Sequence, residues 1–208
     1  MKKYFHPLII LLISEFFLTC VTQDIETSAP SGLDKKFGLY SYKKENSAMV
    51  LIVDVEMARM RKNEKYFPLN VKIANKRLDS LTIDRDNLIL VDQNSNAYNM
   101  ASIDEIQREY DKLFADSRFK NQNLLIGDEI QTSFTFFIRE RSNFFPVKPG
   151  GARVTNFVII GRKRYIDDRI YFPMPSSGIE GQILKLRIDT LELHIPFQCL
   201  PSRQLASR

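Results

Sequence analysis

The sequence predicts a mainly β protein, an antiparallel β-sandwich with one short inserted helix at about residues 102–116. Three observations support this fold class. From Phe37 onward, short apolar stretches alternate with polar residues, as in strands that bury one face. Turn-forming residues separate these stretches at short intervals. Only one segment has the apolar spacing of an amphipathic helix.

Two alternating stretches define the first half of the predicted domain. In residues 49–57, Val53 and Val55 are expected to be buried, with acidic side chains on a solvated face. A charged turn is predicted at residues 59–64. Residues 66–74 repeat the alternation, and the side chains predicted to be buried there are Leu69, Val71 and Ile73.

Shorter strands follow, at residues 81–83, 88–91 and 97–100, with turns at 84–87 and 92–96 between them. The first strand ends in Asn75, a short apolar strand follows, and the next apolar strand ends in Asp92 with an aromatic at Tyr98. In this order, residues 69–98 resemble the immunoglobulin-like domains that many exported bacterial proteins carry. The resemblance implies an immunoglobulin-like β-sandwich and an exported protein, and it implies no catalytic residue.

A capping box predicts where the helix begins. Ser102 precedes Ile103, and Glu105 follows the serine by three residues, so each side chain can bind a backbone N–H at the helix start. The apolar side chains that then share one helical stripe are Ile103, Ile106, Tyr110, Leu113 and Phe114.

The second half of the domain is again strand-rich. Strands are predicted at residues 130–138, 153–160, 170–172 and 183–197, with a charged hairpin tip or loop at 161–168. Phe144 and Phe145 are expected in the core rather than at a partner-facing loop tip. The alternation changes phase at Asp189 and Thr190, which indicates either a bulge or a tight turn.

The N-terminus resembles a bacterial lipoprotein signal. Lys2 and Lys3 precede a short apolar run that ends at Cys20, and the run is too short to span a bilayer. The resemblance implies a signal peptide at residues 1–19 and acylation of Cys20. Phe17 and Thr19 depart from the usual residues before the cysteine, so plain secretion and a retained N-terminal anchor stay open.

The signal also determines how the rest of the chain is interpreted. Residues 20–33 are polar and aperiodic, which predicts a lipid-anchored flexible tether of about 20 Å. Residues 34–200 are predicted to form a single β-sandwich domain, and 201–208 a C-terminal tail. The expected location is the cell envelope, on the outer membrane or periplasmic face, or otherwise outside the cell.

Composition excludes some classes of protein. The formal net charge is +5, with 30 Lys and Arg against 25 Asp and Glu. The charges are mixed along the chain, so we expect no nucleic-acid-binding segment, although mild attraction to anionic surfaces is compatible with this balance. The two cysteines, Cys20 and Cys199, form neither a disulfide framework nor a metal site. Cys199 is unpaired if Cys20 is acylated, and otherwise the two can form a bridge.

Some carboxylates have the spacing of a metal-binding loop or of an acid–base pair. Asp92, Asn94 and Asn96 have the spacing of a calcium loop, but Ala97 and Ile103 stand where such a loop needs Gly and Glu, so a turn is favoured. Two acidic pairs lie in turn segments rich in arginine, which favours solvated ion pairs over acid–base chemistry; they are Asp84 with Asp86 and Asp167 with Asp168.

Catalytic motifs are not found. His194 shares a strand face with Glu192, but no motif places a Ser or Cys nucleophile beside it. No phosphate loop, dinucleotide fingerprint or zinc spacing occurs, so no catalytic residue, metal or cofactor is predicted. A cleft that gathered His194 with two carboxylates would revive an enzymatic role.

A basic run is the candidate partner site. It consists of Arg162, Lys163, Arg164 and Tyr165, and it is either a solvated turn paired with local aspartates or a contact for an acidic protein, anionic glycan or lipid head group. The predicted function is a non-enzymatic interaction or structural module anchored to the membrane by Cys20. The alternative is a carrier that binds an apolar or anionic ligand in the β-sandwich, suggested by the aromatic residues of 130–145.

Overall fold

The computed structural model describes residues 35–36, 40–119, 136–142, 144, 154–189 and 191–197. Strands dominate these residues, and the helices are few and short. The predicted mainly β class is therefore confirmed. The residues from Leu33 to Cys199 form one compact unit.

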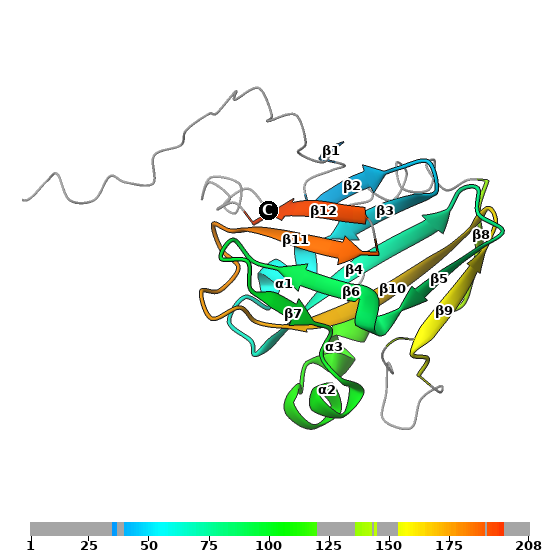
Figure 1. The fold of residues 1–208 in the computed structure, drawn as a ribbon. Helices are drawn as coiled ribbons and strands as arrows, with labels where there is room; N and C mark the ends of the chain where they lie inside the picture. Colours follow the sequence, from blue (N-terminus) through cyan, green and yellow to red (C-terminus); the bar gives the residue numbers. More distant parts are fainter. Residues whose placement is uncertain are drawn as a thin grey trace, which may run out of the picture. The chain divides into compact units, whose positions relative to one another are not determined.

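The larger sheet has six strands in the order β1-β2-β3-β4-β10-β8 (Figure 1). Neighbouring strands run antiparallel, except that β10 and β8 are parallel. The strands span Lys35–Lys36 (β1), Ser41–Glu45 (β2), Met49–Asp54 (β3), Tyr66–Asn75 (β4), Arg164–Pro173 (β10) and Ile138–Arg139 (β8). β4 and β10 pair along ten residues each and form the centre of this sheet.

The alternation in β4 decides which side of the sheet faces the core. Leu69, Val71 and Ile73 are fully buried on the inner face, as predicted, whereas Asn70 and Lys72 lie partly exposed on the outer face. Period-two alternation therefore located this strand correctly and also its buried face.

The end of β3 differs from the prediction. Val55 is buried as expected, but it precedes a short helix, α1 (Glu56–Met60), where a longer strand and then a charged turn were predicted. Asp54, predicted to be solvated, is buried. Its carboxylate accepts a hydrogen bond from Ser41 Oγ at 2.8 Å and one from the backbone N–H of Glu56 at 3.1 Å, which offset the cost of burial.

The second sheet has four antiparallel strands in the order β12-β11-β6-β7. They span Leu191–Pro196 (β12), Ile183–Ile188 (β11), Leu88–Val91 (β6) and Ala97–Asn99 (β7). Ile188 pairs directly with Leu191, and Asp189 has a φ of 53°. The phase change between these strands is therefore a tight hairpin turn and not a bulge.

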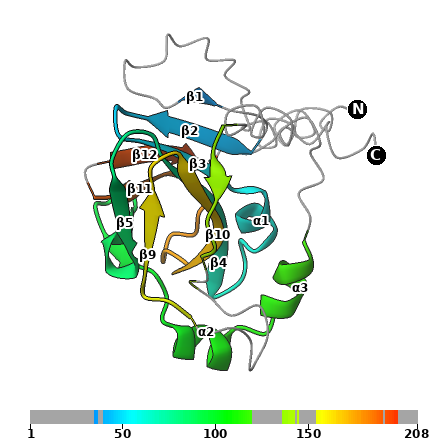
Figure 2. The same ribbon diagram turned by 90° about the vertical axis from the view of Figure 1, so that its right-hand side faces the viewer.

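A third, two-stranded sheet pairs β5 (Ser80–Asp84) with β9 (Phe157–Gly161). β9 and β10 follow each other in the chain but belong to different sheets (Figure 2). The prediction of a hairpin tip or loop over residues 161–168 is wrong for most of its length, because β10 begins at Arg164. Only Arg162 and Lys163 form the turn, and Lys163 has a φ of 56°.

The predicted helix is two helices, α2 (Ile103–Glu109) and α3 (Leu113–Arg118). The capping box is confirmed: Glu105 N–H donates to Ser102 Oγ at 3.1 Å, and Ser102 N–H donates to Glu105 Oε2 at 2.7 Å. A single helix over 102–116 is wrong, because Tyr110 is extended (φ −127°, ψ 102°) and directs its hydroxyl to the buried Asp116. Phe114, expected on the buried stripe, is 47% exposed.

The core lies between the two larger sheets and includes inward side chains of β5 and β9. Phe67 on β4 packs against Phe172 and Phe197, with ring centroids 6.4 and 6.5 Å apart. Phe144 is buried in the same core, as predicted, while Phe145 lies outside the described residues. Most of the strand predicted at 130–138 also lies outside them.

Candidate interaction surface

The predicted partner-binding run does not form one surface. Arg162 and Lys163 are exposed in the β9–β10 turn. Arg164 begins β10 and donates a hydrogen bond to Glu140 at 2.6 Å. Tyr165 is half-buried and packs on the apolar outer face of β3 and β4. Arg162 and Lys163 are therefore the most exposed residues of the run, whereas Arg164 is ion-paired and Tyr165 packs on the sheet.

A buried asparagine joins this turn to the β4–β5 turn. Asn75 Nδ2 donates to the carbonyl of Leu78 at 2.8 Å and to that of Ile160 at 2.9 Å, and its Oδ1 accepts from Leu78 N–H at 2.9 Å. Its own carbonyl accepts from Lys163 N–H at 2.9 Å. A single residue thus holds the two turns side by side, and its side chain is fully satisfied in a buried position.

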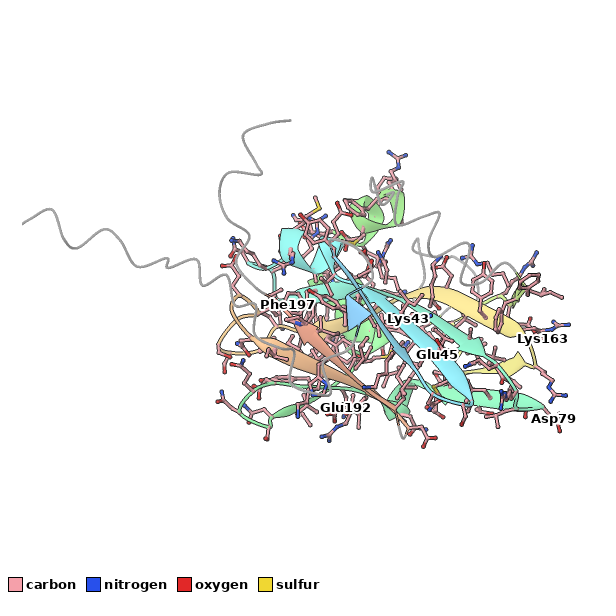
Figure 3. The ribbon with its side chains drawn as sticks, turned by 90° about the horizontal axis from the view of Figure 1, so that it is seen from above. Lys43, Glu45, Asp79, Lys163, Glu192 and Phe197 are labelled. Carbon is pink, nitrogen blue, oxygen red and sulfur yellow. The ribbon has the colours of Figure 1, made fainter. Side chains whose placement is uncertain are left out.

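This junction brings Arg77 close to Arg162 and Lys163, and we call these three residues the basic tip. All three are exposed, and none forms an ion pair with another described residue. Figure 3 shows Lys163 at the same end as Asp79, away from Glu192. Three cations against one aspartate leave these four residues with a net positive charge.

Exposed apolar side chains border the basic tip. Leu78 follows Arg77 and is 41% exposed. Ile138 is 63% exposed and lies beside Lys163, because its N–H donates to the carbonyl of Lys163 at 3.0 Å. Arg77 and Leu78 were missed from the sequence, because they lie far along the chain from the β9–β10 turn. The one sequence feature that could have indicated this contact is Asn75, a polar residue at the end of a strand.

The acidic pair in β10 divides between the two faces of the sheet. Asp167 faces outward and forms ion pairs with Lys72 at 3.5 Å and Arg139 at 3.6 Å, so the predicted ion pairing is confirmed, with other partners. Asp168 faces inward and accepts hydrogen bonds from the backbone N–H groups of Phe144 at 3.0 Å and Arg169 at 2.7 Å. Burial raises the pKa of Asp168.

The other predicted acidic pair, Asp84 with Asp86, lies on either side of Arg85 in the chain. Asp84 Oδ1 accepts from Asp86 N–H at 3.0 Å and caps the one-turn 3-10 helix at residues 85–87. Arg85 is buried and donates to the carbonyls of Ala101, at 2.8 Å, and Phe144. Burial lowers the pKa of Arg85. Its guanidinium therefore fastens two loops to the core.

The 92–96 segment is a turn, as predicted. Asp92 Oδ1 accepts from the N–H groups of Asn94 and Asn96, both at 2.8 Å, and Oδ2 accepts from Asn96 Nδ2 at 2.8 Å and Tyr98 Oη at 2.9 Å. Four donors aimed at one carboxylate leave it poorly suited to a cation. The side chains of the described residues include no group of three or more His, Cys, Asp or Glu that could hold a metal.

His194 lines a hollow of about 360 Å³ on the outer face of the four-stranded sheet, with Lys185 and Arg187 of β11 and Asp92 at its rim. His194 Nε2 lies 3.5 Å from Glu192 Oε1. His194 thus lies beside Glu192 and shares the hollow with Asp92, although Glu192 is not among the residues that line the hollow.

Local hydrogen bonds lower the pKa of both carboxylates. A hydrogen bond from Arg187 at 2.7 Å holds the pKa of Glu192 below its usual value. Burial raises the pKa of Asp92, but its hydrogen bonds from Asn96 and Tyr98 outweigh burial and lower it. Acid–base pairs need environments that push the two pKa values apart, with one near the working pH. Here both shifts point the same way.

A buried charge cluster, which the sequence did not reveal, sits where the helices meet the larger sheet. The side chain of Asp116 is fully buried, and Arg61 donates to its Oδ1 from Nε at 2.9 Å and from Nη2 at 2.7 Å. Tyr110 Oη donates to Oδ2 at 2.6 Å, and Tyr171 Oη lies 3.4 Å from the same oxygen. Every oxygen of the carboxylate is engaged, so the cluster is structural in character.

Comparison with protein-family models, curated proteins and solved structures gives no match. None of the helices in the described ranges has the length and apolarity that crossing a bilayer requires. Cys20 and Cys199 both lie outside the described residues.

Proposed function

We propose that this protein is a non-enzymatic lipoprotein of the bacterial cell envelope, held to the membrane by acylated Cys20, whose β domain acts as an interaction module. The basic tip carries the interaction part of this proposal. Three exposed cations from two separate turns are held together by the buried side chain of Asn75. A rigid positive end of this kind suits an anionic partner surface.

The anchoring part rests on the N-terminal segment. Lys2 and Lys3, the apolar run and Cys20 follow one another as in a lipoprotein signal, and residues 20–33 supply a polar tether. Together these features give a folded module that stands close to a membrane and presents one charged end.

We also infer that the domain is an immunoglobulin-like β-sandwich. Two antiparallel sheets share one core, and the chain leaves the larger sheet after β4, passes through β5, and enters the smaller sheet at β6. Such crossing between sheets is typical of sandwiches with Greek-key connections. The resemblance of residues 69–98 to immunoglobulin-like domains supports the same inference.

Metabolic labelling tests the anchor. Cells that express the full chain are grown with a labelled fatty acid, and we expect the label on the protein and partition into detergent. Cys20→Ala should abolish both, whereas Cys199→Ala, the matched control, should change neither. A single secreted species that begins beyond Cys20 and carries no label would overturn the lipoprotein proposal.

A further inference from the structure

We propose that the basic tip docks on anionic lipid head groups of the membrane that holds the protein. This inference rests on the proposed lipid anchor and names the partner surface of the same module. The charge of the tip is the first argument. Arg77, Arg162 and Lys163 are exposed without an ion pair to any residue the structure describes, so their charges are available to an anionic surface.

The apolar border of the tip favours a bilayer over an acidic protein. Leu78 and Ile138 are exposed beside the cations, and Phe136, two residues before Ile138, is 86% exposed. Surfaces that lie at a membrane interface combine cations for the head groups with apolar side chains that enter the acyl boundary. A purely electrostatic contact with an acidic protein would not require these apolar side chains at the tip.

The direction of β1 also favours the membrane. β1 pairs with β2 in the register Lys35 to Lys43 and Lys36 to Tyr42. The two strands are antiparallel, so the N-terminal end of β1 points toward the Glu45 end of β2. The β2–β3 turn follows Glu45. It is hydrogen-bonded to the start of the β4–β5 turn, because Lys76 N–H donates to the carbonyl of Ala48 at 2.8 Å. The N-terminal end of β1 therefore points toward the side of the domain that carries the tip.

The length of the tether sets how often the tip meets the membrane. Residues 20–34 separate the acylated cysteine from β1, and a flexible chain of that length spans about 20 Å. A short tether converts membrane contact into an intramolecular event with a high effective concentration. A weak, three-cation contact is then enough to hold the module against the bilayer.

Vesicle binding of the processed chain, residues 20–208 with Cys20→Ser, tests the tip without its anchor. All described strands lie within Leu33–Cys199, so this chain retains the folded unit. The probes are vesicles of phosphatidylcholine alone, the same vesicles with one-quarter phosphatidylglycerol, and poly-glutamate as an acidic polymer without lipid. We expect binding to the anionic vesicles that weakens as salt rises.

The test variant is Arg77→Ser, Arg162→Ser and Lys163→Asn, with asparagine chosen because it tolerates the positive φ of residue 163. A cation near an anionic surface contributes about fivefold in affinity, so we expect a loss of about a hundredfold. The control removes three exposed cations elsewhere, Lys62→Ser, Arg108→Ser and Arg118→Ser, and should bind nearly as the parent does. A third variant, Leu78→Ser with Ile138→Ser, should weaken vesicle binding and leave poly-glutamate binding unchanged.

Three results would overturn the membrane proposal. They are equal binding of the tip variant and the control, equal binding to neutral and anionic vesicles, and tip-dependent binding of poly-glutamate alone, which would identify an acidic protein as the partner. The anchor is tested separately, because fatty-acid labelling of Cys20 does not depend on the tip. Loss of labelling with vesicle binding intact would overturn the anchor and leave the tip as a lipid-binding surface.

Discussion

At the scale of single residues, polar side chains inside the fold were the hardest to predict. Asp54, Asn75 and Asp168 stand in segments whose polarity suggested solvent, yet each is satisfied by hydrogen bonds with the backbone or with a neighbouring strand. One of the two donors to Asp168, the N–H of Phe144, lies 24 residues away in the chain. Alternation shows which face a strand buries, but it cannot show which distant donor will meet a buried oxygen.

Asp168 gives a pH-dependent prediction. Burial raises its pKa in the folded protein above the ordinary value of about 3.9. The native state therefore holds this proton more tightly than the unfolded state, so the stabilising contribution of Asp168 is complete below that value and is lost as the pH rises through the folded pKa. We expect the stability of the parent, relative to Asp168→Asn, to fall over this window. Urea unfolding of both proteins from about pH 3.5 to 7 measures it, and parallel profiles would contradict the prediction.

At the scale of elements, the helical region shows how a tertiary contact overrides local propensity. The capping box correctly gave the start of α2, because both partners lie within four residues. The stripe then predicted continuation through Tyr110, but the chain turns there and Tyr110 Oη reaches Asp116. The two short helices are thus fastened to the sheet through one carboxylate shared by Arg61 and tyrosines of two elements.

Removal of that carboxylate should destabilise the protein strongly. Asp116→Ala leaves Arg61 and the hydroxyl of Tyr110 without their acceptor in a buried site, and breaking a buried pair in this way costs about 3–5 kcal/mol. The matched control is Asp111→Ala. Its carboxylate is exposed and pairs with Lys112, so the loss there should be far smaller. Chemical denaturation gives both free energies of unfolding, and equal losses would show that the cluster is not a fastening point.

At the scale of the whole molecule, the period-two pattern predicted more of the fold than any motif did. It gave the mainly β class, the buried face of β4, and the short strands β5, β6 and β7 with the turns between them. It did not give the separation of β9 from β10 into different sheets, because strand pairing depends on contacts between distant segments. The basic tip was predicted only in part for the same reason. Arg162 and Lys163 were named, but Arg77 is brought near them by the contacts of Asn75, which alternation does not reveal.

Because the two larger sheets share one core, a single charged substitution on the inner face should unfold the whole domain. Val71 is fully buried in β4 and lies directly opposite Asp168 of β10. Val71→Asp would place an unpaired carboxylate in the core and beside a second one, which costs more than most domains can lose. We expect this variant to lose cooperative unfolding and the β-type far-UV spectrum. Thr82→Asp, also at a β-branched strand residue but with an exposed side chain, should unfold within about 0.5 kcal/mol of the parent. If Val71→Asp instead stays soluble and unfolds cooperatively, the face of the larger sheet assigned to the core is wrong, and with it the packing of the two sheets against each other.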